Sequence, residues 1–216
     1  MNKKEKIGKI LNILATVYPD AGTALIYKTP FELMVAAILS AQCADKQVNR
    51  VTARLFKKYN TPQEFAALSQ EDLAEEIKGC GLYRNKSKYI IEASRELVKR
   101  YGGTVPRNRS ELESLPGVGS KTAGVVSGVI YGSSALPVDT HVHRIAHRLG
   151  LSRASNPRKV EEELAGHIPP HQRMAAHHRL IAHGRKVCLA RRPACGNCHL
   201  VEFCEYQPKE DRHSCT

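Results

Sequence analysis

Apolar residues recur three and four positions apart along most of the chain, which is the spacing of one buried face on an α-helix. Amphipathic helices are predicted over residues 45–59, 71–78, 85–100, 141–149 and 172–186. Residues 31–43 are almost uniformly apolar and predict a buried helix. Because the sequence contains no series of alternating, β-branched segments, we predict an all-α protein.

Helix starts recur in one form. Thr29-Pro30 and Thr61-Pro62 each place a capping threonine before a proline at the first helical position, with a glutamate two residues after the proline. Asn156-Pro157 is expected to open a helix in the same way. Gly102-Gly103 and residues 131–137 are the expected breaks between helical segments.

Composition and charge narrow the class of protein. Hydrophobic residues make up 42% of the 216 positions and charged residues 25%, which is typical of a folded globular protein. The net charge of +12 favours a polyanionic partner, nucleic acid ahead of an anionic membrane, although a charge that serves solubility alone is the alternative. Lys and Arg concentrate in residues 84–109 and 141–192, and acids in residues 61–80, so we expect one basic and one acidic face.

Neither a membrane span nor an export signal is evident. No apolar run approaches the ~20 residues that cross a bilayer, and the N-terminal segment lacks the small-residue cleavage site of a signal peptide. Seven cysteines, an odd number, without an export signal argue against a disulfide framework. We therefore expect a cytoplasmic protein with no membrane partner.

Four cysteines form a compact group near the C-terminus. They are Cys188, Cys195, Cys198 and Cys204, spaced as C-x6-C-x2-C-x5-C. Four thiolates on a short irregular loop can hold one zinc ion or one [4Fe–4S] cluster, and the spacing alone does not decide between them. Buried cysteines without a ligand are the alternative, although four so close together rarely serve packing alone.

The other cysteines and one histidine pair are assigned structural roles. Cys43, Cys80 and Cys215 lie outside the four-cysteine loop and are expected to be core or tail thiols. His143 and His147 stand four residues apart on one predicted helix. Because no further ligands accompany them, a solvated or core role is favoured over metal binding.

Residues 110–123, SELESLPGVGSKTA, are the most informative segment of the chain. Ser110 and Glu113 have the spacing of a capping box, which predicts a short helix at this point. Pro116 is expected to end that helix, because a proline cannot continue it.

A tight turn and a second helix are expected to follow. Gly117 and Gly119 permit a turn that other residues would strain, and Ser120 is expected to cap a helix over residues 121–131. This arrangement is a helix-hairpin-helix, in which the N–H groups at the second helix start can hold a phosphate. A helical corner that binds nothing is the alternative.

Lys121 stands in the first turn of that second helix. The positive end of the helix dipole disfavours an ammonium group there, which favours an amine nucleophile; a lysine that only binds phosphate is the alternative. Asp139 lies eighteen residues further on, at a predicted helix start, where an acid most often serves as an N-cap. Together with the four-cysteine loop, these two residues suggest covalent chemistry on nucleic acid.

Three ordered motifs resemble one family. They are LPGVGSKTA at residues 115–123, VDTHVHR at 138–144 and the four-cysteine loop. In this order they resemble endonuclease III, a family of bifunctional DNA glycosylase/AP lyases with a helix-hairpin-helix and an iron–sulfur cluster. LSAQCADKQVN at 39–49 and GLYRNKSKYI at 81–90 are similar to further stretches of that family, so the resemblance covers nearly the whole chain.

The resemblance implies two helical domains that flank a DNA-binding cleft. A six-helix domain at about 22–132 contains the helix-hairpin-helix, at about 110–131. A second domain joins residues 1–21 to residues 133–216 and ends in a [4Fe–4S] loop over 188–204. The resemblance, and not the spacing, is the reason to expect iron–sulfur rather than zinc.

The resemblance also implies site residues. Lys121 and Asp139 would be catalytic, on opposite sides of the cleft. Gln42 and Leu82 would fill the gap left by a flipped nucleotide, although a helix-surface amide and a small core contact are their ordinary alternatives. The other residues expected to contact DNA are Gly117, Gly119, Thr122 and Arg144.

The sequence departs from the common family pattern in small ways. Cys43-Ala44 follow Gln42 where the family often has threonines, and His143 occupies a variable position. These residues adjoin the expected pocket and are expected to affect base preference. Lys121 argues against the related adenine-mismatch glycosylases, which lack a lysine there.

The implied activity is removal of oxidised or ring-saturated pyrimidines, followed by strand cleavage at the abasic site. Lys121 would form a Schiff base with the sugar, and β-elimination would cleave the strand. The expected partner is double-stranded DNA with damaged bases or abasic sites, bound by a monomer at the nucleoid. A monofunctional glycosylase of the same fold and a non-catalytic DNA-binding module are the alternatives.

Overall fold

The computed structural model describes residues 1–206, and Cys215 lies outside the described residues. Residues 1–206 contain helices and no β-strand, so the predicted all-α class is confirmed. The chain divides into two compact units. The inserted unit is Thr23–Ala135, and the terminal unit joins Met1–Gly22 to Leu136–Thr216.

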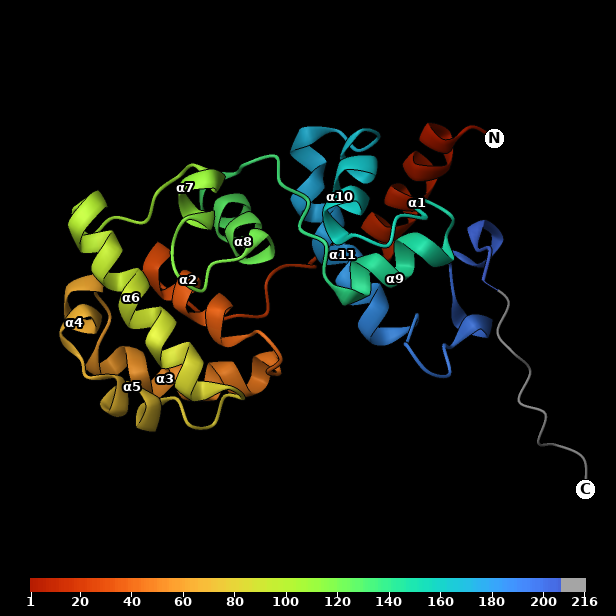
Figure 1. Ribbon diagram of the computed structural model, residues 1–216. Helices are drawn as coiled ribbons and strands as arrows, with labels where there is room; N and C mark the ends of the chain where they lie inside the picture. The colour runs from red at the N-terminus through yellow and green to blue at the C-terminus, as the bar shows by residue number, and fades with distance from the viewer. Residues whose placement is uncertain (207–216) are drawn as a thin grey trace, which may run out of the picture. The chain divides into compact units, whose positions relative to one another are not determined.

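The inserted unit is built from short helices around one long one (Figure 1). They are α2 (Pro30–Leu39), α3 (Asp45–Lys58), α4 (Pro62–Ala67), α5 (Gln70–Glu76), α6 (Tyr83–Tyr101), α7 (Arg109–Glu113) and α8 (Ser120–Tyr131). These are seven α-helices, whereas the resemblance implies six for this domain. The Ser69 side chain accepts the N–H of Asp72 and starts α5, in the segment where the sequence pattern predicts a helix over residues 71–78.

α2 forms the centre of this unit. Every residue from Phe31 to Leu39 is buried. The helix packs against α3, α6 and α8, while α6 packs against α4 and α5. Phe31 meets Phe65 of α4 edge to face, with ring centroids 5.2 Å apart. The apolar run in the sequence therefore becomes the core that supports α6 and α8.

The predicted helix boundaries are largely confirmed. The side chains of Thr29, Thr61 and Asn156 each accept a backbone N–H and start α2, α4 and α10 (Pro157–Ala165). Gly102 and Gly103 have φ of +58° and +81° and end α6, a conformation that glycine adopts without strain.

The terminal unit joins the two ends of the described chain. Its further elements are α1 (Lys3–Val17), α9 (Thr140–Arg148), α11 (Arg173–Lys186) and the short turns η1 (Pro170–Gln172), η2 (Cys195–Asn197) and η3 (Val201–Phe203). α11 packs against both α1 and α9, so the first and last long helices of the chain lie side by side (Figure 1). Ile7, Ile10 and Leu14 of α1 are buried in this contact region.

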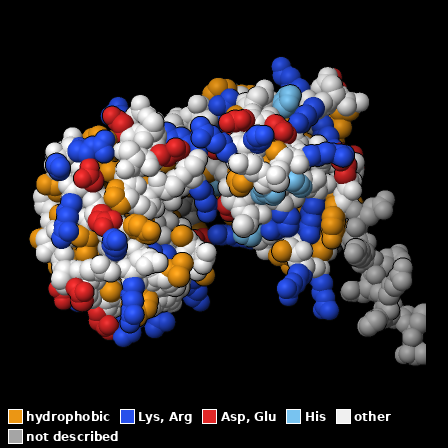
Figure 2. All heavy atoms as spheres, in the orientation of Figure 1, with side chains coloured by type: hydrophobic (Ala, Val, Ile, Leu, Met, Phe, Trp, Pro, Cys, Tyr) orange, Lys and Arg blue, Asp and Glu red, His pale blue; other side chains and the backbone are white. Residues whose placement is uncertain are grey.

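Charged side chains are distributed unevenly. Figure 2 shows acidic side chains gathered over α5 at the edge of the inserted unit, while Lys and Arg are spread over both units on the same face. The acidic patch agrees with the predicted acidic segment, and a single basic face stays a prediction. Among residues 1–206, no helix has the length and apolar character needed to cross a membrane.

Candidate active site and nucleic-acid interface

The hairpin starts two residues before the predicted position. Asn108 is the N-cap of α7, and its side chain accepts the N–H of Ser110 at 2.9 Å. Glu113 instead accepts a hydrogen bond from Arg109 Nε at 2.9 Å. The predicted Ser110–Glu113 capping box is therefore wrong, because Asn108 caps the helix two residues earlier and the Glu113 carboxylate bonds Arg109 instead.

The turn of the hairpin needs glycine at one position. Gly117 has φ of +74°, and a Cβ there would lie 2.6 Å from Cβ of Tyr89 on α6. Gly119 has φ of −78°, and no atom lies within 4 Å of the position of its Cβ. The turn therefore requires glycine at position 117, whereas Gly119 has an ordinary backbone conformation and open space beside its backbone.

The second helix of the hairpin starts without a side-chain cap. Gly119 is the N-cap of α8, and Ser120 is its first residue. The predicted cap at Ser120 is therefore wrong; its Oγ accepts a hydrogen bond from Arg109 Nη2 at 2.7 Å instead. The N–H groups of the first turn are thus free of a capping side chain, which suits an anion.

Lys121 is exposed on this first turn, and Thr122 beside it is half-buried. α8 packs against α2 and α7, and small buried residues along it allow close packing. They are Ala123, Gly124, Ser127 and Gly128. Lys121 therefore stands exposed at the start of a helix that is held by its packing.

Gln42 and Leu82 have unusual backbone conformations. Their φ angles are +52° and +58°, and within residues 1–206 the only other non-glycine residue with positive φ is Arg192. A left-handed conformation costs an L-residue about 1–2 kcal/mol. Both side chains are exposed, and Leu82 keeps 57% of its surface accessible. Such strain is found most often at sites where it serves function.

The loops that carry these two residues adjoin each other. A Cβ on Gly81 would lie 3.4 Å from the carbonyl oxygen of Gln42. α2 ends at Leu39 and not at residue 43 as predicted, because the chain turns after Ser40, whose Oγ bonds the Ala37 carbonyl. The structure therefore brings Gln42 and Leu82 onto neighbouring loops, which the sequence could not show.

A buried lysine, which no sequence pattern indicates, lies at the base of these loops. Lys86 is 4% exposed, and its Nζ donates to the Leu39 carbonyl at 2.8 Å. Burial lowers the pKa of Lys86, and the Cys43 and Cys80 thiols partly oppose this. Burial raises the pKa of Cys80 to about 12, and contact with Cys43 adds to that shift.

Asp139 is the N-cap of α9 in the terminal unit. Its Oδ1 accepts the N–H groups of His141 at 2.9 Å and Val142 at 2.8 Å. The half-buried carboxylate is thereby held in one orientation at the positive end of the helix. The capping role is observed, and the catalytic role of Asp139 stays a prediction.

Arg144 ties α9 to the start of the four-cysteine loop. Its Nη2 donates to the carbonyls of Gly184 at 3.0 Å and Cys188 at 2.8 Å, and its Nε donates to Cys188 at 3.1 Å. The guanidinium is half-buried among these acceptors. Arg144 thus supports the loop, and a contact with DNA stays a prediction.

The histidine pair of α9 has partners in the adjoining loop. The His143 and His147 rings stack with centroids 4.3 Å apart. Their Nε2 atoms lie 3.2 Å from the Ser155 carbonyl and 2.9 Å from the Ala154 carbonyl, respectively. These bonds fit the structural role expected for the pair.

The four cysteines of the loop are free, half-buried thiols. Burial raises the pKa of Cys198, and the other three thiols of the loop contribute further, so all four share one neighbourhood. Among residues 1–206, no three His, Cys, Asp or Glu side chains are gathered closely around a point that fits a metal ion.

Hydrogen-bond donors are directed at the sulfur atoms. Arg148 Nη1 lies 3.2 Å from Cys188 Sγ, and Nε2 of the buried His183 lies 3.6 Å from Cys198 Sγ. The other ring nitrogen of His183 contacts the Tyr18 hydroxyl at 3.1 Å. Such donors stabilise metal-bound thiolates, so the donor set and its surroundings fit a four-cysteine metal or iron–sulfur centre.

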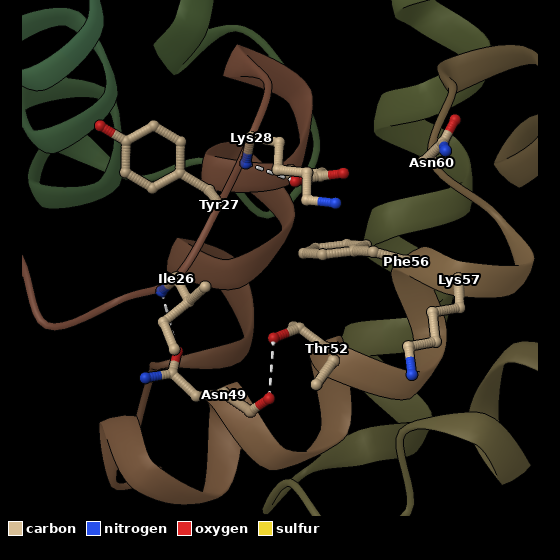
Figure 3. Close-up of a pocket in the computed structure, with 10 residues that line it drawn as sticks. Ile26, Tyr27, Lys28, Asn49, Thr52, Phe56, Lys57 and Asn60 are labelled. Carbon is tan, nitrogen blue, oxygen red and sulfur yellow. Dashed lines mark hydrogen bonds between the residues drawn. The ribbon is translucent and has the colours of Figure 1, made fainter.

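A separate pocket lies at the other end of α2. It has a volume of about 290 Å³. Figure 3 shows it between the segment Ile26–Lys28, which precedes α2, and Asn49, Thr52 and Phe56 of α3. None of the predicted site residues lines it, so it is not the pocket expected for a flipped base.

Comparison with known proteins identifies related sequences and folds. Residues 35–170 match the family model described as "HhH-GPD superfamily base excision DNA repair protein". The chain is 45% identical to Endonuclease III of Bacillus subtilis over 203 residues, which are 94% of this chain and 93% of that protein.

Two solved structures share the whole fold. "Structure of a non-covalent Endonuclease III-DNA Complex" aligns with a TM-score of 0.91 and 44% identity, over 95% of this chain and 96% of that one. "Structure of a Trapped Endonuclease III-DNA Covalent Intermediate: Estranged-Adenine Complex" aligns with a TM-score of 0.92 and 45% identity, over 95% and 97%.

Proposed function

The chain belongs to the endonuclease III family of HhH-GPD base excision DNA repair proteins, and from that membership we propose how its own residues carry out the reaction. The protein is a base excision repair enzyme, a DNA glycosylase and AP lyase. We propose that it acts as a monomer on duplex DNA that contains oxidised or ring-saturated pyrimidines or abasic sites. This substrate places it with the nucleoid in the cytoplasm.

The helix-hairpin-helix binds the phosphate backbone of DNA. The N–H groups at the start of α8, which no side chain caps, bind a phosphate, and the open space beside Gly119 lets the strand approach the backbone. Thr122 lies in the same turn. In the terminal unit, the exposed side chains of Arg191 and Arg192 on the cysteine loop add further phosphate contacts.

Gln42 and Leu82 fill the space that a flipped nucleotide leaves. Base chemistry requires the target nucleotide to leave the stack, at a cost of a few kcal/mol that is smallest for a damaged base. The exposed apolar side chain of Leu82 is unfavourable in water and favourable against bases, while the Gln42 amide can hydrogen-bond to a base edge. Their strained, adjoining loops support this assignment.

Lys121 is the nucleophile. Its neutral Nζ attacks C1′ of the damaged nucleotide, and the glycosidic C–N bond breaks, with its electron pair and a proton going to the base. Opening of the sugar gives a Schiff base between Nζ and C1′. The iminium acidifies the C2′ protons, so loss of one C2′ proton expels the 3′ phosphate and cleaves the strand.

Asp139 stabilises the positive charge that develops on the sugar. The two N–H groups that hold its Oδ1 keep the carboxylate oriented. Because asparagine can also cap a helix but carries no charge, the capping and catalytic roles can be separated by substitution.

We assign a [4Fe–4S] cluster to Cys188, Cys195, Cys198 and Cys204. When bound, the cluster supplies four iron–thiolate bonds that cross-link the loop. Arg148 donates to Cys188 Sγ, His183 contacts Cys198 Sγ, and Arg144 holds the loop start. These residues thereby hold Arg191 and Arg192 in place toward DNA.

The observation that carries this proposal is the exposed Lys121 amine on the first turn of α8, in a chain that matches endonuclease III over nearly its whole length. Borohydride added during reaction with an abasic-site duplex should reduce the Schiff base and cross-link protein to DNA. Lys121→Gln should abolish cross-linking and nicking while it still binds DNA.

Asp139→Asn serves as the second variant of this experiment. It should bind DNA and keep the α9 cap but turn over at least about 100-fold more slowly. Cross-linking by Lys121→Gln would place the nucleophile elsewhere. A wild-type protein that binds DNA but neither cross-links nor nicks would favour a non-catalytic DNA-binding module, and excision without nicking would favour a monofunctional glycosylase.

A further inference from the structure

Lys86 is a buried ammonium group to which the reaction above gives no role. It lies on the first turn of α6, where the positive end of the helix dipole disfavours a cation. No carboxylate of the described residues lies within ion-pair distance of its Nζ, and burial without such a partner is costly. Burial of the Lys86 ammonium group at this position is unfavourable for stability, so a functional reason for the lysine is expected in its contacts.

Lys86 contacts both strained loops at once. Its backbone N–H donates to the Leu82 carbonyl at 3.0 Å, and its side-chain Nζ donates to the Leu39 carbonyl at 2.8 Å. Leu39 is the last residue of α2, three residues before Gln42. One residue therefore joins the loop of Leu82 to the loop of Gln42.

The bond at Leu39 is also favourable for the end of α2. The last carbonyls of a helix lack intrahelical partners and form its negative end, so a cation there is stabilising. The Leu39 carbonyl therefore fixes where the lysine side chain points, and the lysine supplies a donor to a carbonyl at the end of α2. The turn that places Gln42 at φ of +52° begins at this point.

We propose that Lys86 is a positioning residue for base extrusion, which holds the Gln42 and Leu82 loops together so that both side chains enter the duplex as one rigid element. This inference rests on the proposed function of those two residues. Without the lysine, each strained loop is free to relax separately, and the two side chains no longer arrive at the gap together.

Loss of the Lys86 ammonium group is expected to slow base extrusion and to leave DNA binding almost unchanged. Lys86→Met keeps an unbranched side chain one atom shorter than lysine and removes the ammonium donor. Extrusion of the base and its excision in a single turnover should slow by about tenfold or more. Affinity for undamaged duplex should change by less than about twofold, because the hairpin contacts remain. Lys86→Arg retains a donor and should recover part of the lost rate.

The experiment measures extrusion directly, with 2-aminopurine placed beside the lesion and its fluorescence followed by stopped flow. Two controls on α6 lie away from the loops. Ser94→Ala removes another buried side-chain bond, from Oγ to the Ile90 carbonyl at 2.7 Å. Leu97→Ala empties part of the core and gives a protein destabilised without any change at Lys86.

The outcomes separate this inference from the proposed function. Slow extrusion by Lys86→Met with fast extrusion by both controls, and partial recovery by Lys86→Arg, supports the inference. Extrusion by Lys86→Met at the rate of the controls overturns it, provided that Gln42→Ala and Leu82→Ala are slow. If those two variants extrude at the wild-type rate, the proposed role of the loops is what fails. If Lys86→Met does not fold, Lys86→Leu, which also lacks a donor, carries the same test.

Discussion

The two units hold their candidate residues by different means. In the inserted unit the candidate residues Gln42, Leu82 and Gly117 all have positive φ, on turns that adjoin a continuous apolar core, and one buried side chain, that of Lys86, bonds the end of α2. In the terminal unit, side-chain hydrogen bonds position the candidate residues: Asp139 caps α9, and Arg144 bonds the start of the cysteine loop.

This difference indicates how each unit keeps its shape. The loops of the inserted unit follow from helices that are already packed, so their geometry needs no ligand. The cysteine loop has only short 3-10 turns and depends on arginine side chains and four thiols. We therefore expect metal loss to affect the terminal unit and leave the inserted unit intact.

The largest expected effect comes from removing a cluster ligand. Cys198→Ser should lose the yellow-brown colour of an iron–sulfur protein and bind DNA roughly 100-fold more weakly, since the loop that carries Arg191 and Arg192 loses its cross-link. Hydrogen exchange should rise in the terminal unit and stay unchanged in the inserted unit. Visible absorption, titration with duplex DNA and exchange mass spectrometry measure these three results.

Cys43→Ser is the matched control for that variant, because Cys43 is a thiol outside the loop. It should keep the colour and the DNA affinity. A colourless wild-type protein with one bound zinc would show that the assignment of iron–sulfur is wrong. Equal loss of hydrogen-exchange protection in both units of Cys198→Ser would show that the inserted unit also depends on the metal.

The next effect separates two glycines of the hairpin. Gly117→Ala forces a Cβ into the space of Tyr89 at positive φ, so it should lower the free energy of unfolding by about 2 kcal/mol or more. Gly119→Ala has open space and ordinary φ, so stability should hardly change while DNA affinity falls. Urea unfolding and DNA titration of both variants provide the test, and equal loss of stability would refute the assignment.

A smaller effect is expected at Asp139. Asp139→Ala removes the cap of α9 and should lower the free energy of unfolding by about 1 kcal/mol, whereas Asp139→Asn should keep it. Both variants should lose activity, because both lack the carboxylate charge. An active Asp139→Asn would leave the residue with a structural role only, which thermal unfolding and single-turnover kinetics together would reveal.

The smallest effect concerns the salt dependence of binding. Arg191→Ala and Arg192→Ala should each reduce the magnitude of the slope of log affinity against log salt by about 1, if each side chain contacts one phosphate. Affinity measured from low to moderate salt provides this slope. A slope unchanged in both variants would exclude the cysteine loop from the interface.

Local sequence signals predicted most of the helices but not every cap. Thr29, Thr61 and Asn156 were predicted as N-caps because a proline follows each at the first helical position. The caps at Ser110 and Ser120 were predicted wrongly, because Asn108 and Gly119 precede them and Arg109 bonds both Glu113 and Ser120. Short helices offer several adequate caps, and side-chain partners decide among them.

Sequence motifs indicate candidate site residues but not the backbone conformation or the buried contacts that hold them. Lys121 and the four cysteines follow from spacing and resemblance, but the left-handed conformations of Gln42 and Leu82 depend on how their loops turn in the fold. Lys86 could not be found from sequence, because a lysine at the start of an amphipathic helix is normally solvated. Its carbonyl acceptor lies 47 residues away in the chain.

The proposed reaction requires a covalent bond between Lys121 and the sugar. The most direct measurement is to trap the protein on an abasic-site duplex with borohydride, digest both components and locate the adduct by mass spectrometry. A single sugar adduct on Nζ of Lys121 is the predicted result. An adduct on another lysine or on the N-terminal amine would contradict the account, as would DNA that is nicked while the protein stays unmodified.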